Sequence, residues 1–74
     1  MPHVNIKYFP VPLEAEQRSG LVAAVTAAVR DAFGCDEGVV SIALEPVEAS
    51  QWTERVYTPE IVGRGHLLCK TPDY

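Results

Sequence analysis

The hydrophobic pattern of the first half of the chain changes period twice. Residues 2–9 alternate in hydrophobicity with the two-residue period of a β-strand, and Pro10 ends this strand because proline cannot donate to a ladder. Residues 13–33 repeat apolar side chains at helical spacing, which predicts a helix that Gly34 terminates. We expect residues 39–44 to form a second apolar strand. We therefore predict an α/β fold, a βαβ unit whose parallel strands are joined by a right-handed crossover.

The second half of the chain has no clear hydrophobic period. Residues 47–57 predict an irregular segment or a single helical turn that carries Trp52. The sequence Thr58-Pro59-Glu60 has the features of a helix start, namely a capping side chain, a first-turn proline and an acidic residue that suits the helix dipole. We therefore expect a short C-terminal helix over residues 58–69.

The length of the chain favours self-association. Seventy-four residues allow one domain, expected over residues 1–74, and a chain this short is marginally stable alone. One helix covers one face of a two-stranded sheet, and we expect the other face to be mostly apolar and covered by a second copy. A homodimer then completes the sheet. Cys35 and Cys69 lack the spacing of a zinc site, so we expect no metal.

Composition narrows the classes of ligand and location. Ten acidic and six basic residues give a net charge of −4, and the basic residues are scattered, which disfavours nucleic acid. No apolar run reaches the length of a membrane span and the first residues lack a secretory signal, so we expect no membrane partner and a cytoplasmic protein. A few cations focused in a cleft can still attract a small carboxylate.

Pro2 gives the sharpest indication of chemistry. Removal of Met1 makes the chain begin with a secondary amine, which can act as a general base. An apolar pocket disfavours the protonated amine and lowers its pKa below the usual α-amino range, so the base is free near neutral pH. A Met-Pro start is also common in proteins where it has no catalytic role.

Pro2 heads a sequence that resembles the 4-oxalocrotonate tautomerase superfamily, and above all its small dimeric bacterial branch of phenylpyruvate or putative tautomerases. The similarity rests on residues 2–10, 41–44, 50–52 and 68–74 and covers nearly the whole chain. It implies a cofactor-free keto-enol tautomerase that acts on a 2-oxo acid enol such as phenylpyruvate. In such an enzyme the Pro2 amine returns to carbon the proton that it takes from oxygen.

The resemblance also implies residues that surround the substrate. Trp52 falls where the family has an apolar active-site aromatic, which implies a pocket wall; a core or interface role suits it equally. Ser41 and Gln51 can donate hydrogen bonds to a carbonyl or carboxylate. His3, next to Pro2, is expected at the surface or an interface.

Two arginines of the founding family members are absent. They bind a dicarboxylate, and here residues 11–13 read Val-Pro-Leu and the second position is Ser41. This departure favours a monocarboxylate or a more apolar substrate. Arg55, Arg64 and Lys7 are the candidate replacement cations, and Arg55 is our choice for the substrate site.

Two other functions remain open. A protonated Pro2 suits hydration or hydrolytic dehalogenation on the same scaffold, although the missing arginines disfavour both. A chain that keeps Met1 has an amide at the Pro2 nitrogen and no basic lone pair. Retention of Met1 therefore favours the second alternative, a non-catalytic dimer that binds a small ligand or a protein.

Overall fold

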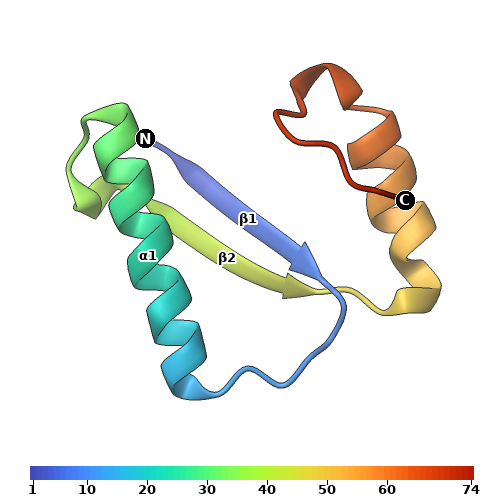
Figure 1. Ribbon diagram of the computed structural model, residues 1–74, viewed down its shortest axis with the longest axis horizontal. Helices are drawn as coiled ribbons and strands as arrows, with labels where there is room; N and C mark the ends of the chain where they lie inside the picture. Colours follow the sequence, from blue (N-terminus) through green and yellow to red (C-terminus); the bar gives the residue numbers. More distant parts are fainter.

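A computed structural model describes residues 1–74 and places two parallel strands against one long helix (Figure 1). β1 (His3–Tyr8) and β2 (Ser41–Pro46) form a two-stranded parallel sheet, and α1 (Ala15–Phe33) connects them. In the register of the sheet His3 pairs with Ser41 and Tyr8 pairs with Pro46. The predicted βαβ fold is confirmed.

Capping explains where α1 begins and ends. Glu14 and Gln17 form a reciprocal capping box: the Glu14 side chain accepts from the Gln17 backbone, and the Glu14 N–H donates to Gln17 Oε1 at 2.8 Å. Gly34 ends the helix with a left-handed φ of 64°, which costs glycine little because it has no Cβ. The helix begins two residues later than the pattern predicted and ends where predicted.

β2 also begins two residues later than predicted. The preceding residues form the 3-10 turn Glu37–Val39, whose N-cap Asp36 accepts a bond from the Gly38 N–H at 3.2 Å. The strand then continues to Pro46. A proline is tolerated there because the next N–H, that of Val47, donates to the Tyr8 carbonyl at 2.8 Å.

The two faces of the sheet differ in chemistry. Paired residues of parallel strands share a face, so one face carries Val4, Ile6, Tyr8, Ile42, Leu44 and Pro46. Val4 and Val29 line one cavity, which places this face against α1. The opposite face carries His3, Asn5, Lys7, Ser41, Ala43 and Glu45. The expectation that this second face is mostly apolar was wrong, because the strict alternation in β1 gathers its polar side chains there.

The C-terminal segment, residues 49–74, is helical but irregular. It contains the 3-10 turn Ala49–Gln51, the π-helix Thr53–Val62 and a second 3-10 turn Gly65–Leu67. The expected helix therefore begins five residues earlier than predicted, and Pro59 lies inside it. The hydrogen bond from the Gly63 N–H to the Thr58 carbonyl at 2.9 Å has the five-residue spacing of a π-turn. Hydrogen bonds of this spacing replace the four-residue backbone hydrogen bonds of an α-helix, which a proline interrupts.

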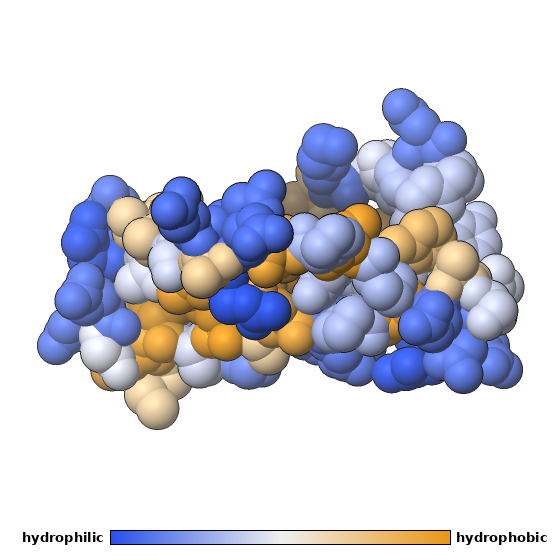
Figure 2. Space-filling model, turned by 90° about the horizontal axis from the view of Figure 1, so that it is seen from below, coloured by the Kyte–Doolittle hydropathy of each residue, from blue (hydrophilic) through white to orange (hydrophobic).

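The isolated chain is open. Only Val47 and Val56 are fully buried. The accessible surface is 5570 Å², against roughly 4,500 Å² for a folded chain of this mass. The radius of gyration is 13.9 Å, against about 11 Å for a compact chain of this length. Hydrophobic surface runs as a band between hydrophilic ends (Figure 2). None of the helices has the length and apolar character needed to span a membrane.

Candidate active site

Pro2 lies directly before β1 and is held by the neighbouring strand. The Ser41 N–H donates to the Pro2 carbonyl oxygen at 3.1 Å. Pro2 is half-buried and lines a cavity of about 450 Å³ together with Met1, His3, Val4, Val29 and Phe33. The last two of these belong to the C-terminal half of α1. The surroundings of Pro2 within one chain are therefore mostly apolar.

Ser41 is near Pro2 in the structure, and its hydroxyl is already engaged. The distance between Ser41 Oγ and His3 Nδ1 is 2.6 Å, a hydrogen bond on the polar face of the sheet. Both residues are exposed. His3 thus lies at the surface of the chain, and Ser41 remains within reach of a group bound near the start of β1.

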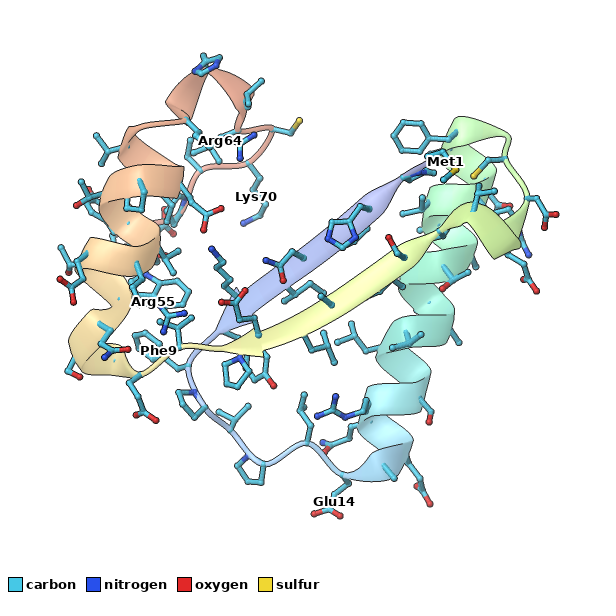
Figure 3. All side chains as sticks on the ribbon, turned by 180° about the vertical axis from the view of Figure 1, so that it is seen from behind. Met1, Phe9, Glu14, Arg55, Arg64 and Lys70 are labelled. Carbon is cyan, nitrogen blue, oxygen red and sulfur yellow. The ribbon has the colours of Figure 1, made fainter.

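Gln51, Trp52 and Arg55 gather at the opposite end of the sheet. Arg55 donates to Gln51 Oε1 at 3.2 Å and to Glu45 Oε2 at 3.1 Å. In Figure 3, Arg55 and Phe9 lie at one end of the strands and Met1 at the other. The six residues of β1 span roughly 20 Å. One chain therefore separates these three residues from Pro2.

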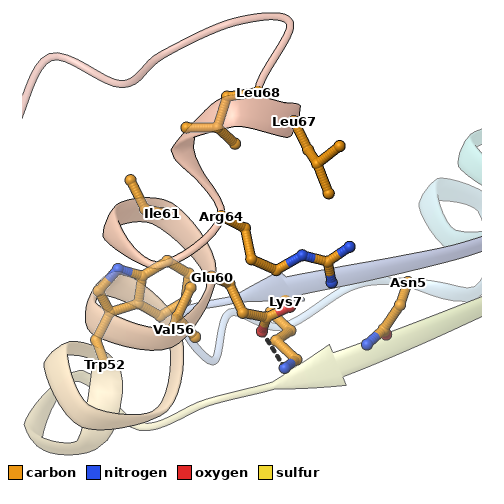
Figure 4. Close-up of a pocket in the computed structure, with 9 residues that line it drawn as sticks. All are labelled: Asn5, Lys7, Trp52, Val56, Glu60, Ile61, Arg64, Leu67 and Leu68. Atoms are coloured by element: carbon orange, nitrogen blue, oxygen red, sulfur yellow. Dashed lines mark hydrogen bonds and ion pairs between the residues drawn. The ribbon is translucent and has the colours of Figure 1, made fainter.

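Trp52 lines two cavities. It contacts Phe9 edge to face, with ring centroids 5.0 Å apart, and these two residues line an apolar cavity of about 320 Å³ with Tyr74. A second cavity, of about 360 Å³, lies between β1 and the C-terminal segment (Figure 4). It is lined by Asn5, Lys7, Trp52, Val56, Glu60, Ile61, Arg64, Leu67 and Leu68. We call it the Arg64 cavity.

The sequence reasoning did not single out Phe9, Glu60 or Tyr74. Phe9 carried a usable signal, because it is a large apolar residue at a position where the alternation of β1 calls for a polar one. No sequence signal indicated that Glu60 pairs with Lys7, since the two residues lie far apart in the sequence.

The electrostatic features outside these cavities are modest. The hydrogen bond and the charge of Asp31 raise the pKa of the exposed Arg30 guanidinium on α1, with Nε and Oδ1 3.0 Å apart. No group of three or more His, Cys, Asp or Glu side chains is arranged to hold a metal ion. The candidate site thus combines a half-buried Pro2 with apolar walls and a few cations.

Comparison with known proteins agrees with this architecture. The sequence model of the family described as Tautomerase enzyme matches residues 2–54, which include the βαβ unit and Trp52. Proteins named Tautomerase PptA match over 74 residues, with 39% identity in Klebsiella pneumoniae, 36% in an Enterobacter species and 30% in Pectobacterium carotovorum. Each match covers 100% of this chain and 97% of the relative. The chain therefore belongs to the tautomerase family, a family of isomerases.

Proposed function

We propose that this chain is a keto-enol tautomerase for a 2-oxo acid enol such as that of phenylpyruvate, and that Pro2 is its acid–base group once Met1 is removed. The Pro2 amine takes the proton from the enol hydroxyl as the carbonyl forms. The resulting ammonium returns a proton to the neighbouring carbon, so the base is regenerated and no cofactor is needed.

The observation that carries this proposal is the position of Pro2 at the start of an edge strand, β1, which is followed at its far end by Phe9 in contact with Trp52. The Pro2 and Tyr8 carbonyls accept hydrogen bonds from the N–H groups of Ser41, the first residue of β2, and Val47, the residue after β2. Successive residues direct their backbone groups to alternate sides, so the N–H and C=O groups of His3, Asn5 and Lys7 face the free edge of β1. This edge is available to another strand.

We propose that a second copy adds its own β1 to this edge in the antiparallel direction. A register centred on Asn5 pairs His3 with the partner's Lys7 and Pro2 with the partner's Tyr8, which is next to the partner's Phe9. The single chain exposes roughly 1,000 Å² more than a compact chain of its mass. This excess is comparable to the area of about 800 Å² that each partner buries in a standard interface.

The homodimer proposed here completes the pocket over Pro2. Val4, Val29 and Phe33 form the wall from the same chain. The partner's Phe9, the partner's Trp52 and the partner's Tyr74 form the other wall. Exclusion of water by both walls disfavours the protonated amine and lowers the pKa of the Pro2 nitrogen, which makes it a base near neutral pH.

The same geometry supports a substrate with one carboxylate. Arg55, our choice from the sequence, has its guanidinium engaged by Gln51 and Glu45. The positions of the two family arginines hold apolar residues and Ser41. A second carboxylate buried without a cation carries a large desolvation cost, so an aryl-pyruvate enol suits the pocket better than a dicarboxylate.

The test compares two forms of the protein on the enol of phenylpyruvate. One form has Pro2 as its first residue, and the other carries a residue permanently fused ahead of it. The fused form has no basic lone pair at Pro2, and we expect kcat/KM to fall by about 10²- to 10⁴-fold. In the processed form kcat/KM rises with pH through the pKa of the amine. Intact mass spectrometry verifies the first residue of each form. Equal kcat/KM in both forms rejects Pro2 as the base and favours the binding dimer instead.

A further inference from the structure

We propose that Arg64 binds the carboxylate of the substrate, in the Arg64 cavity between β1 and the C-terminal segment (Figure 4). This proposal rests on the tautomerase function proposed above and identifies the cation of its site. The ligand class that follows is a monocarboxylate with an apolar body.

The pairing of the six cations singles out Arg64. Lys7 is paired with Glu60, Arg30 with Asp31 and Arg55 with Glu45. The remaining three cations, Arg18, Arg64 and Lys70, make no ion pair and no side-chain hydrogen bond. Of these three, only Arg64 lines a cavity. It is the one cation that is both unengaged and placed where a ligand can enter.

The charges of the Arg64 cavity match a single carboxylate. Glu60 offsets Lys7, so Arg64 supplies the one uncompensated positive charge among the lining residues. The Arg64 guanidinium points from the C-terminal segment towards the strands, between Leu67 and the pair of Lys7 and Glu60 (Figure 4). Asn5 donates its amide to Glu45 and adds no charge. The planar guanidinium can bind both oxygens of a carboxylate at once.

The remaining walls suit an apolar body. Five of the nine lining residues are hydrophobic, namely Trp52, Val56, Ile61, Leu67 and Leu68. The volume of about 360 Å³ lies in the usual range for small-molecule sites, about 300 to 1,000 Å³. Trp52 is shared with the cavity of Phe9 and Tyr74, which receives the partner's Pro2 in the proposed dimer. The two cavities adjoin at Trp52, so a carboxylate held by Arg64 lies next to the cavity that receives the base.

The kinetic test uses Arg64→Ala with Arg18→Ala as its matched control, because both remove one unpaired, exposed arginine. Loss of a charge-assisted contact should lower kcat/KM for the phenylpyruvate enol by roughly 10- to 100-fold in Arg64→Ala, chiefly through KM. The methyl ester of the same substrate carries no charge and should show no such loss. Arg18→Ala should leave both substrates unchanged. Thermal unfolding of the two variants checks that each is folded.

A binding test separates this proposal from the proposed function. Trp52 is the only tryptophan, so its fluorescence reports occupancy of the cavity without turnover. We expect 3-phenylpropanoate to bind the unmodified protein and Arg18→Ala alike, and Arg64→Ala roughly 10- to 100-fold more weakly. The neutral amide of 3-phenylpropanoate should bind the unmodified protein, Arg18→Ala and Arg64→Ala with the same affinity. Arg64-dependent binding without turnover rejects the tautomerase function and keeps the site. Turnover with the same KM and the same binding in both variants overturns the role of Arg64.

Discussion

The βαβ unit and the C-terminal segment are built in different ways. In residues 3–46 a parallel ladder and a helix capped at both ends satisfy the backbone locally. The C-terminal segment has a π-helix with a proline inside it, two 3-10 turns, and no regular structure after Leu67. Side-chain interactions connect the two regions: Lys7 with Glu60, Glu45 with Arg55, and Phe9 with Trp52.

This difference indicates that the C-terminal segment depends on contacts with other parts of the protein or with a partner chain. Neither region has much of a core, because the only two buried residues are Val47, which follows β2, and Val56, within the π-helix. The βαβ unit has a regular backbone ladder and the C-terminal segment has none. Leu67 and Tyr74 are more than half exposed, at 56% and 66%. Isolated turns of this kind are marginal in water, and we expect a partner chain to order them.

The largest effect should come from breaking the edge of β1. Asn5→Pro removes the N–H that faces the free edge and leaves the N–H groups that face β2 intact. We expect light scattering to show a monomer in place of the proposed dimer. Activity should fall by about 10²-fold, because Pro2 loses the wall that the partner supplies.

Asn5→Ala is the matched control. It loses the same hydrogen bond from Asn5 Nδ2 to Glu45 as the proline variant does, but it keeps the backbone N–H. It should remain a dimer, so the comparison isolates the effect of the backbone N–H on assembly. A proline variant that stays dimeric and active would place the interface elsewhere.

The fold was predictable where local sequence decides it. The alternation in β1, the helical spacing of α1 and the Gly34 stop are each local features, and they were confirmed to within two residues for β1, α1 and the start of β2. The C-terminal helix was misplaced because Thr58-Pro59 has the chemistry of a helix start, while the structure begins the helix at Thr53. The expectation of an apolar second face was wrong because the register of the sheet pairs the polar residues His3 and Lys7 of β1 with Ser41 and Glu45 of β2.

The candidate site was harder to predict than the fold. Pro2 follows from its chemistry alone, but a sequence gives no distance between Pro2 and Trp52, and β1 holds them at opposite ends. The sequence alone does not distinguish the roles of Arg55 and Arg64. Only the positions of Glu45 and Gln51 show that Arg55 is engaged while Arg64 is not.

A smaller effect is expected within the C-terminal segment. A Cβ at Gly63 would lie 2.7 Å from the Pro59 carbonyl oxygen and 3.1 Å from that of Thr58. Gly63→Ala therefore forces the end of the π-helix to shift, and we expect a loss of roughly 1 to 3 kcal/mol in the free energy of unfolding. Faster proteolysis of residues 49–74, with α1 amide protection unchanged, would show that the loss is confined to this region. Gly65→Ala is the control, since nothing lies within 4 Å of its Cβ; an equal loss there would contradict the clash.

The smallest effect should be a gain in the βαβ unit. Gly20 lies in the interior of α1, and no atom lies within 4 Å of the Cβ that alanine would add. Gly20→Ala should raise the free energy of unfolding by about 0.5 to 1 kcal/mol, because alanine has the higher helix propensity and loses less entropy on folding. Thermal unfolding measures this as a rise in Tm of a few degrees, roughly 4 to 8 °C per kcal/mol for a chain of this size. Gly34→Ala is the contrasting control, because its left-handed φ of 64° penalises a side chain and should lower Tm.

Activity should be unchanged in Gly20→Ala, since the outer face of α1 takes no part in the proposed dimer. A loss of stability or of dimer in that variant would mean that another surface covers this face of α1. The division between a βαβ unit ordered by its own backbone hydrogen bonds and a C-terminal segment that depends on a partner would then not hold.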